Sequence, residues 1–341
     1  MRTKLSASAL ALSLAMTGVA TASELNVVTS IRPLHSLVAN VTQGVSTPIN
    51  IVPANASPHD YALKPSDAQA LQNADIIFWV GHELESFLAK SITSLPQEAK
   101  VIELQDHEDH FHFLPIREVS LDDHDHDAHD HEEHEHEDDH GHDDHEHDHD
   151  DEHAHEDEHG HDDHEGHHHG DTDLHIWLDV ENAKHFVELV AEELSTVDSE
   201  HAAQYQENAA ATLEKLDALN AEIKAQLAGL EAHKFVTFHD AYQYFEAQYG
   251  LTNAGTVTLS PEIKPGAKRL TELKAHLKED QISCIFAEPQ FDAKLVDLAV
   301  EGTNVKQAVL DPLGAELEDG PELYFNLIRD MGNSFADCLG E

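Results

Sequence analysis

One stretch of this chain, residues 107–170, consists almost entirely of His, Asp and Glu, and it limits how the remaining sequence can fold. No apolar residue recurs at a regular period between Asp122 and Gly170, so this segment has nothing to bury against a core. Such a composition is typical of disordered chains. We therefore expect a disordered insertion, and the sequences before and after it must supply the fold.

The sequences on both sides of the insertion alternate short apolar runs with helical patterns. Alternating strands and helices predict parallel sheets that are covered by helices on both faces. The expected strands are residues 25–28, 50–52 and 76–80 before the insertion, 174–178 directly after it, and 234–238, 282–287 and 305–310 further along. The predicted fold class is therefore α/β, with two lobes that each contain a parallel sheet flanked by helices.

A long helix is expected to join the two lobes. From Ser199 to Leu230, apolar residues recur in steps of three and four, with no Gly or Pro before Gly229. A helix of about 30 residues is about 45 Å long, enough to run along both lobes. The predicted organisation is a signal peptide at 1–22, an N-terminal lobe at 23–198 that contains the insertion at 107–170, the linking helix at 199–231 and a C-terminal lobe at 232–341.

The first residues have the pattern of a secretory signal. A basic start is followed by an apolar run from Leu5 to Val19 and a small-residue cleavage site that ends at Ala22. This run is too short to span a bilayer stably, and no later segment reaches the roughly 20 apolar residues of a membrane helix. A lipid anchor would need a cysteine at the cleavage site, but the first cysteine is Cys284. We therefore expect a protein that moves freely in the periplasm after cleavage near Ala22, without membrane insertion.

The chain contains only two cysteines, Cys284 and Cys338. Disulfides persist in an oxidising compartment, and a bridge between these two residues would contribute roughly 4 kcal/mol on chain-entropy grounds. Two buried, unpaired thiols are the alternative. Neither cysteine has the C-x-x-C spacing of a redox or zinc-ribbon site, so any metal must be bound through nitrogen and oxygen.

The charge of the chain indicates which ligands it can attract. Its formal net charge is −49, and residues 118–170 supply 25 acidic side chains with no Lys or Arg. An acidic surface of this strength repels nucleic acids and anionic lipids and attracts cations. Nucleic-acid binding is therefore excluded, and metal cations are the expected ligands.

Nine of the 31 histidines lie outside the acidic tract, at positions 35, 59, 82, 175, 185, 201, 233, 239 and 276. His59, His175 and His239 stand in loops or at the ends of predicted strands. A single histidine in such a place is more often an ordinary hydrogen-bonded residue. Three of them from distant segments favour one metal site, because imidazole is a preferred zinc ligand and separate segments must converge to close a tetrahedral site. The histidines within predicted helices are expected to be solvated or to pack against neighbouring helices: His185, His201 and His276.

Four motifs carry a resemblance to a known family. They are residues 56–61 (Ala-Ser-Pro-His-Asp-Tyr) with 64–67 (Lys-Pro-Ser-Asp), 173–179 (Asp-Leu-His-Ile-Trp-Leu-Asp), 238–245 (Phe-His-Asp-Ala-Tyr-Gln-Tyr-Phe) and 310–314 (Leu-Asp-Pro-Leu-Gly). In this order, with a His-rich insertion before the second motif, the chain resembles the periplasmic zinc-binding proteins of high-affinity zinc ABC importers, within the cluster A-I solute-binding proteins. The resemblance covers essentially the whole mature chain. It implies a binding protein that captures Zn²⁺ between two lobes and delivers it to an inner-membrane ABC permease.

The resemblance also implies the ligands of this site. The three expected metal ligands are His59, His175 and His239. Related manganese carriers have a carboxylate in place of His239, and an imidazole there favours zinc over manganese. Asp311 matches a ligand position in several family members and is the candidate fourth ligand. Some zinc carriers instead have a Glu directly before the first histidine, where this chain has Pro58. The fourth ligand therefore stays open between Asp311, a water molecule and a histidine of the tract.

Two further expectations come from the resemblance. The equivalents of Cys284 and Cys338 form a disulfide in similar zinc carriers, which favours pairing over free thiols. The closed, zinc-loaded form of such a carrier docks on the permease, which removes the ion. We expect the protein to act as a monomer.

The acidic tract is itself expected to bind metal. It holds 22 of the histidines, interleaved with carboxylates, which permits many overlapping and weak sites because each binding event must order a disordered chain. The histidines chosen as auxiliary ligands are His124, His126, His134, His136, His145, His147, His149, His167, His168 and His169. One hypothesis is a zinc collector that passes ions to the main site. The other is a solvated spacer that binds metals unselectively.

Two rival functions share the same ligand chemistry. Three histidines and a water molecule also form some catalytic zinc sites. Outside the acidic tract the sequence contains no hydrolase signature such as H-E-x-x-H, and inside it the matches lie in a segment without the apolar periodicity of a helix, so we expect no enzyme activity. The other rival is a periplasmic zinc buffer without a dedicated transporter, which would differ only in its partners.

Overall fold

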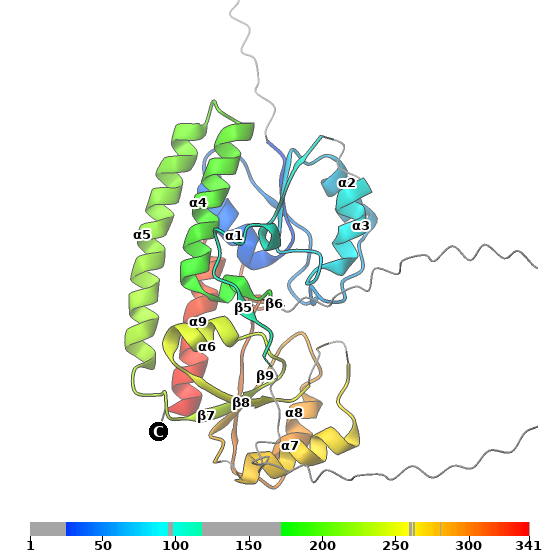
Figure 1. Cartoon of the computed structure of the whole chain (residues 1–341), viewed down its shortest axis with the longest axis vertical. Coiled ribbons are helices and arrows are strands. Elements are labelled where there is room, and N and C mark those ends of the chain that lie inside the picture. The colour runs from blue at the N-terminus through cyan, green and yellow to red at the C-terminus, as the bar shows by residue number, and fades with distance from the viewer. Residues whose placement is uncertain are drawn as a thin grey trace, which may run out of the picture.

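A computed structural model of the chain describes residues 25–94, 98–117, 172–258, 261, 263–279 and 281–340. The predicted signal peptide at 1–22 and the ten auxiliary histidines of the tract lie outside these residues. The described part contains two four-stranded parallel sheets flanked by helices (Figure 1). This architecture confirms the predicted α/β fold.

The first sheet has the strand order β2-β1-β3-β4, and all its pairs are parallel. Its strands are β1 (Val27–Thr29), β2 (Ile49–Asn50), β3 (Ile76–Trp79) and β4 (Lys100–Glu103). The central strands β1 and β3 are buried throughout, which explains the apolar Val27-Val28 of β1 and the unbroken apolar sequence of β3. Strand β4 lies at the edge and is partly exposed, so its sequence has no apolar run and was not predicted. Helices α1 (Arg32–Val41), α2 (Pro65–Gln72) and α3 (Ser86–Ser94) connect these strands, and a short 3₁₀ helix (Leu104–Asp106) follows β4.

The second sheet has the order β10-β9-β7-β8 and is also parallel. Its strands are β7 (Lys234–Thr237), β8 (Thr252–Thr256), β9 (Cys284–Ala287) and β10 (Lys306–Val309). Strand β8 was not predicted, because its sequence, Thr-Asn-Ala-Gly-Thr, is polar and contains a glycine. Helices α6 (Gln243–Tyr249), α7 (Ala267–Glu279) and α8 (Lys294–Val300) belong to this half of the chain.

Helix α5 (Ala202–Leu227) is the predicted long helix, three residues shorter at each end than the expected 199–230. It runs along one side of the molecule from the first sheet to the second (Figure 1) and packs against α1, α4 (Val180–Val197) and α9 (Leu323–Leu339). Gly229, with a φ of +94°, turns the chain after the helix ends. The side chains that α5 buries follow the predicted stripe: Tyr205, Ala209, Thr212, Leu216, Leu219, Ile223 and Leu227.

One hydrophobic core connects both sheets through these helices. It includes Phe78 of β3, Leu216 of α5, Phe335 of α9 and Phe235 of β7. A second, smaller core lies between the other face of the second sheet and helices α7 and α8, around Leu273. Because the main core is continuous, the long helices stabilise the relative placement of the two sheets instead of acting as a bare spacer.

The predicted start of the insertion is wrong: residues 107–117 belong to the described fold, Phe111 is buried in the core, and this segment contributes one strand of a small antiparallel pair. Strand β5 (Leu114–Pro115) pairs with β6 (Thr172–Asp173), with Leu114 opposite Asp173. The strand predicted at 174–178 is wrong: residues Ile176–Leu178 form a buried 3₁₀ helix. Its side chains Ile176, Trp177 and Leu178 are buried. The chain then enters α4, and the side chain of the N-cap residue Asp179 accepts a hydrogen bond from the backbone N of Glu181.

Cys284 at the start of β9 and Cys338 near the end of α9 form a disulfide, with their Cα atoms 6.0 Å apart. The predicted pairing is thus present, and it fastens the last helix to a central strand. None of the helices in the described ranges is both long and apolar enough to cross a membrane.

Candidate metal centre

Three histidines from separate segments meet between the two sheets. His59 lies in the loop after β2, His175 stands between β6 and the 3₁₀ helix, and His239 lies two residues beyond the end of β7. Loops at the carboxyl ends of parallel strands are the usual place for ligand sites in open α/β sheets. The three residues were singled out from the sequence, and the structure brings them together.

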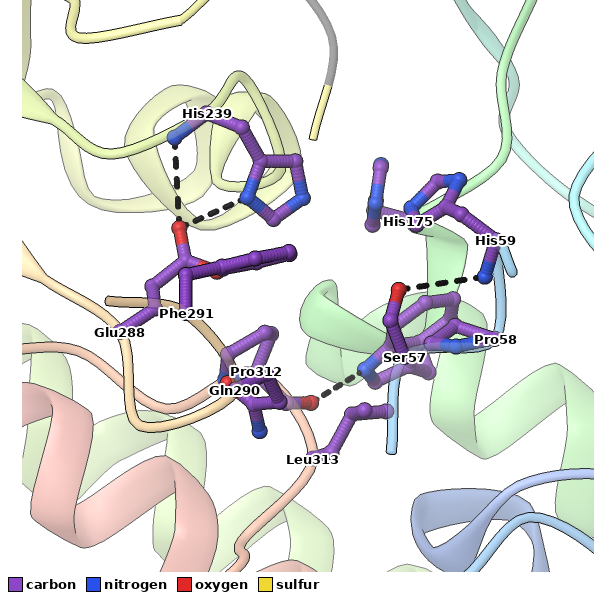
Figure 2. A pocket seen from close by; sticks show the side chains of 11 residues that line it. Ser57, Pro58, His59, His175, His239, Glu288, Gln290, Phe291, Pro312 and Leu313 are labelled. Atoms are coloured by element: carbon purple, nitrogen blue, oxygen red, sulfur yellow. Dashed lines mark hydrogen bonds and ion pairs between the residues drawn. The ribbon is translucent and has the colours of Figure 1, made fainter. Parts of the chain in front are cut away.

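The three imidazoles surround a common point. One ring nitrogen from each of His59, His175 and His239 lies within 4.8 Å of the others, and these are the only described residues that form such a group. The ring centroids are 5.3–5.8 Å apart. Figure 2 shows His239 on one side of the pocket and His59 and His175 on the other. Nitrogens this close can be bridged by a single ion whose bonds to nitrogen are about 2.0–2.1 Å long.

Two buried carboxylates orient two of the rings. Asp173 accepts hydrogen bonds from the backbone N and Nδ1 of His175, at 3.0 and 2.8 Å. Glu288 accepts from the same two atoms of His239, at 3.3 and 2.7 Å (Figure 2). The Nε2 atoms of His175 and His239 are buried without a hydrogen-bond partner among the described residues. A carboxylate on Nδ1 fixes the tautomer that leaves Nε2 as a lone-pair donor, which is the arrangement of metal-binding histidines.

The orienting carboxylates were missed in the sequence analysis. Glu288 directly follows β9, so the strand-end argument that selected His239 could have selected it too. Asp173 belongs to the same motif as His175 and precedes it by two residues. A buried acid beside a candidate histidine is the signal that would have found both.

Apolar side chains close the rest of the pocket. Trp177, Phe291, Pro312 and Leu313 line it together with the histidines. The indole Nε1 of Trp177 donates to the carbonyl of Pro312 at 2.8 Å, so the 312–313 turn is held against the pocket. This lining lowers the local dielectric and strengthens any interaction between the imidazoles and a cation.

The surroundings shift the pKa values of two of the histidines in opposite directions. Burial, followed by the neighbouring rings of His175 and His239, holds the pKa of His59 well below its usual value. Burial also acts to lower the pKa of His239, but the charge and hydrogen bond of Glu288 outweigh it, so this pKa is raised. His59 is therefore neutral at neutral pH, whereas His239 is the ring that holds a proton more readily.

Asp311 does not join the three histidines. Its Oδ1 accepts hydrogen bonds from the backbone N of Leu313 (3.0 Å) and Gly314 (2.9 Å) and from Nε2 of Gln290 (2.8 Å), and its Oδ2 accepts from the backbone N of Ala315. These donors make the carboxylate the cap of the turn after β10. In this structure Asp311 therefore caps a turn and is not among the grouped ligand atoms.

The histidines assigned to helices have other partners. His185 on α4 is exposed and lies 3.5 Å from a carboxylate oxygen of Glu188. His201 precedes α5 instead of lying inside it and contacts Asp198 at 2.7 Å. Nε2 of His276 on α7 lies 2.8 Å from the carbonyl of Ala254. Their expected roles as solvated or packing residues agree with these positions.

Comparison with known proteins decides the family. The family described as "Zinc-uptake complex component A periplasmic" matches residues 27–338. The chain belongs to this family. It is 50% identical over 316 residues to the high-affinity zinc uptake system protein ZnuA of Brucella suis biovar 1 (strain 1330), with 92% of each chain covered. It is 40% identical over 330 residues to the protein of that name from Haemophilus ducreyi, covering 96% of this chain and 97% of the relative.

Solved structures share the fold. A crystal structure of ZnuA has a TM-score of 0.69 and 21% identity, covering 93% of this chain and 99% of that chain. The solute-binding protein FpvC of P. aeruginosa in complex with Ni²⁺ also has a TM-score of 0.69, at 19% identity, covering 93% of this chain and 97% of that chain. This family member therefore has the two-sheet architecture of known metal-binding proteins.

Proposed function

We propose that this chain is the zinc-capturing component of a high-affinity ABC importer, which binds one Zn²⁺ between its two lobes and delivers it to an inner-membrane permease. The observation that carries the proposal is the convergence of His59, His175 and His239, with two of the rings oriented by buried carboxylates. The names of the relatives support zinc as the cargo, as does a solved ZnuA structure with zinc bound.

The ligand set favours zinc on chemical grounds. In this proposal, Nε2 of His175, Nε2 of His239 and a ring nitrogen of His59 bind the ion, and neutral imidazoles prefer zinc to the harder manganese. Because Asp311 caps a turn, the fourth position is assigned to a water molecule or to a histidine of the tract. A site that binds its cargo and gives it up needs no catalytic group, and we assign the chain no enzymatic role.

The wider setting is part of the same proposal. Secretion would be directed by residues 1–22, and the lobes at 23–198 and 232–341 would close on zinc as a monomer in the periplasm while the helix at 199–231 holds them together. Belonging to a zinc-uptake family supports a permease partner. A zinc buffer without a transporter would be distinguished by the lack of a metal permease and an ATPase encoded beside the gene.

The ligands can be tested directly by diffraction. Crystals of the zinc-loaded protein, measured on both sides of the zinc absorption edge, should show one anomalous peak within about 2.0–2.2 Å of nitrogens from His59, His175 and His239. If the rings of His59, His175 and His239 share no such peak, the ligand assignment is rejected. The same map would identify the fourth ligand.

Glu288 should contribute to zinc affinity without touching the ion. In Glu288→Gln the acceptor of the His239 hydrogen bond remains, but the charge that makes the ring more basic is lost. We expect zinc affinity to fall about tenfold, at the lower end of the range of about 10–100-fold for partners of metal ligands. Competition with a chromophoric chelator measures the change. Glu301→Gln, an exposed glutamate after α8, is the matched control and should bind like wild type; an E288Q affinity equal to wild type would contradict the role of Glu288.

The acidic tract should bind additional zinc. Because β5 and β6 pair, the residues flanking the tract lie close together, and a short Gly-Ser linker can replace 118–170. We expect the shortened protein to bind fewer ions at saturation while keeping the tightest one. Equilibrium dialysis followed by metal analysis gives both numbers. An unchanged stoichiometry would show that the tract does not bind zinc.

A further inference from the structure

Arg117 joins the base of the insertion to the second half of the molecule. It follows β5 by two residues, and its guanidinium contacts two acids near the start of α6. Its Nη2 lies 2.6 Å from Oδ1 of Asp240, and its Nε lies 3.0 Å from Oδ2 of the same residue. Nη2 also lies 2.6 Å from Oε2 of Glu246. We call these three residues the Arg117 cluster.

The cluster is largely removed from solvent. The side chains of Arg117, Asp240 and Glu246 are 32%, 21% and 3% exposed. Among the described residues, Arg117 supplies the only Lys or Arg contact to either acid, while Asn253 donates to Glu246 at 2.8 Å. Burial raises the pKa of Glu246 to about 7, against the attraction of Arg117. Moving one of these side chains away would leave a buried charge without its partner, which is energetically costly. The cost keeps the three side chains in their relative positions.

Two uncharged side chains of α6 make three hydrogen bonds to the same elements. The hydroxyl of Tyr244 on α6 accepts from the backbone N of Leu114 at 2.9 Å and donates to the carbonyl of Asp173 at 2.5 Å. Nε2 of Gln243 donates to the carbonyl of Pro115 at 3.1 Å. Helix α6 is therefore bonded to both strands of the β5–β6 pair, and Arg117 adds the charged part of this connection.

Both ends of this connection lead to candidate ligands. Asp240 directly follows His239 in the sequence, and Asp173 of β6 holds Nδ1 of His175. The chain of contacts runs from His239 through Asp240 and Arg117 to β5, and from β5 through its pairing with Asp173 to His175. It links two rings that come from different segments.

We infer that Arg117 is a positioning residue of the metal centre: through Asp240 and Glu246 it fixes His239 relative to His175 and so slows metal release. The inference rests on the proposed function. No atom of Arg117 belongs to the imidazole group, so it acts through the segments that it joins. The guanidinium of arginine can donate several hydrogen bonds to two acids at once, whereas the ammonium group of lysine supplies the same charge but only part of this geometry.

The test compares Arg117→Gln and Arg117→Lys with wild type in the full mature chain. Each protein receives less than one equivalent of Zn²⁺, and release is followed after addition of excess chelator. We expect R117Q to lose zinc roughly tenfold faster, by analogy with outer partners of metal ligands, and R117K to recover part of the difference. With Co²⁺ as the probe, the visible absorption of R117Q should change in position or intensity, because it reports the geometry of the ligands.

Arg329→Gln is the matched control. Arg329 makes a comparable pair with Glu222 between α9 and α5, at 3.1 and 3.2 Å, away from the metal centre. It should leave zinc release and the cobalt spectrum unchanged. If R117Q does not fold, as judged by thermal unfolding of the metal-free protein, Glu246→Gln tests the same cluster by removing its most buried acid.

The outcomes separate this inference from the proposed function. If wild type fails to retain zinc against the chelator, the proposed function fails. If wild type retains zinc while R117Q, or E246Q in its place, shows the wild-type release rate and cobalt spectrum, the positioning role alone is wrong. Faster release that R117K does not recover at all would also overturn it, because the loss would then be independent of the contact that Lys can restore.

Discussion

We expect His239→Ala to lower the affinity for zinc by more than about a hundredfold. Structural zinc sites have apparent binding free energies of about 10–16 kcal/mol, so one ligand of a four-coordinate site accounts for roughly 3 kcal/mol or more, and each 1.4 kcal/mol or so is tenfold in affinity. His239 is 5% exposed and is held by Glu288, and among the described residues no other metal-binding side chain joins the group of three imidazoles. Alanine also leaves the carboxylate of Glu288 buried without its partner.

The measurement is a competition titration with one equivalent of zinc, because the acidic tract can hold further ions weakly. His185→Ala is the matched control, since it removes an exposed imidazole on α4 that lies outside the group. It should bind zinc like wild type. An H239A protein whose affinity stays within a few-fold of wild type would show that the ion is bound elsewhere.

Much of the fold followed from the sequence because its central elements are buried on both faces. The Ile-Ile-Phe-Trp run of β3 and the repeating apolar stripe of α5 can be read without any knowledge of neighbours. Edge strands β4 and β8 could not be predicted this way, since Lys100–Glu103 and Thr252–Thr256 owe their conformation to pairing with a neighbouring strand. The run after the insertion was misassigned for a different reason: a short buried apolar run looks the same in a strand and in a helical turn, and Ile176–Leu178 forms a buried 3₁₀ helix.

In the candidate site, too, some residues could be predicted from the sequence and others could not. His59 and His239 could be selected because loops after the strands of α/β sheets form ligand sites. His175 lies outside the two four-stranded sheets and was selected because imidazole is a preferred zinc ligand. The carboxylate of Asp311 accepts hydrogen bonds from the backbone of the turn that follows it. The spacing of residues in the sequence does not show whether an acidic side chain faces a pocket or bonds to its own backbone. Glu288 and Arg117 act through contacts made 49 and 123 residues away in sequence, to His239 and Asp240, which only the packed structure reveals.

Zinc affinity should decrease as the pH falls, and His239 should dominate the change. A metal ligand must be unprotonated, so a proton and Zn²⁺ compete for each ring. An imidazole of ordinary pKa, about 6.5, loses roughly thirtyfold in effective affinity between about pH 7.5 and pH 5. The pKa of His239 is raised by Glu288, so a proton begins to compete with zinc for this ring at a higher pH. The loss of zinc affinity caused by protonation of His239 therefore exceeds roughly thirtyfold. The pKa of His59 is lowered, so this ring stays available to the metal over most of the range.

The sign of the effect follows from these directions: affinity is complete above the raised pKa of His239 and is lost as the pH falls through it. Competition titrations with one equivalent of zinc, at several values between about pH 7.5 and pH 5, measure the decrease. Glu288→Gln supplies the internal control. Without the carboxylate that favours the protonated ring, the pKa of His239 should drop, and the decrease should move to lower pH even though the variant binds zinc more weakly at neutral pH. Equal affinity at both ends of the range would mean that imidazoles are not the ligands. A decrease that stays at the same pH in E288Q would mean that a group other than His239 takes up the proton.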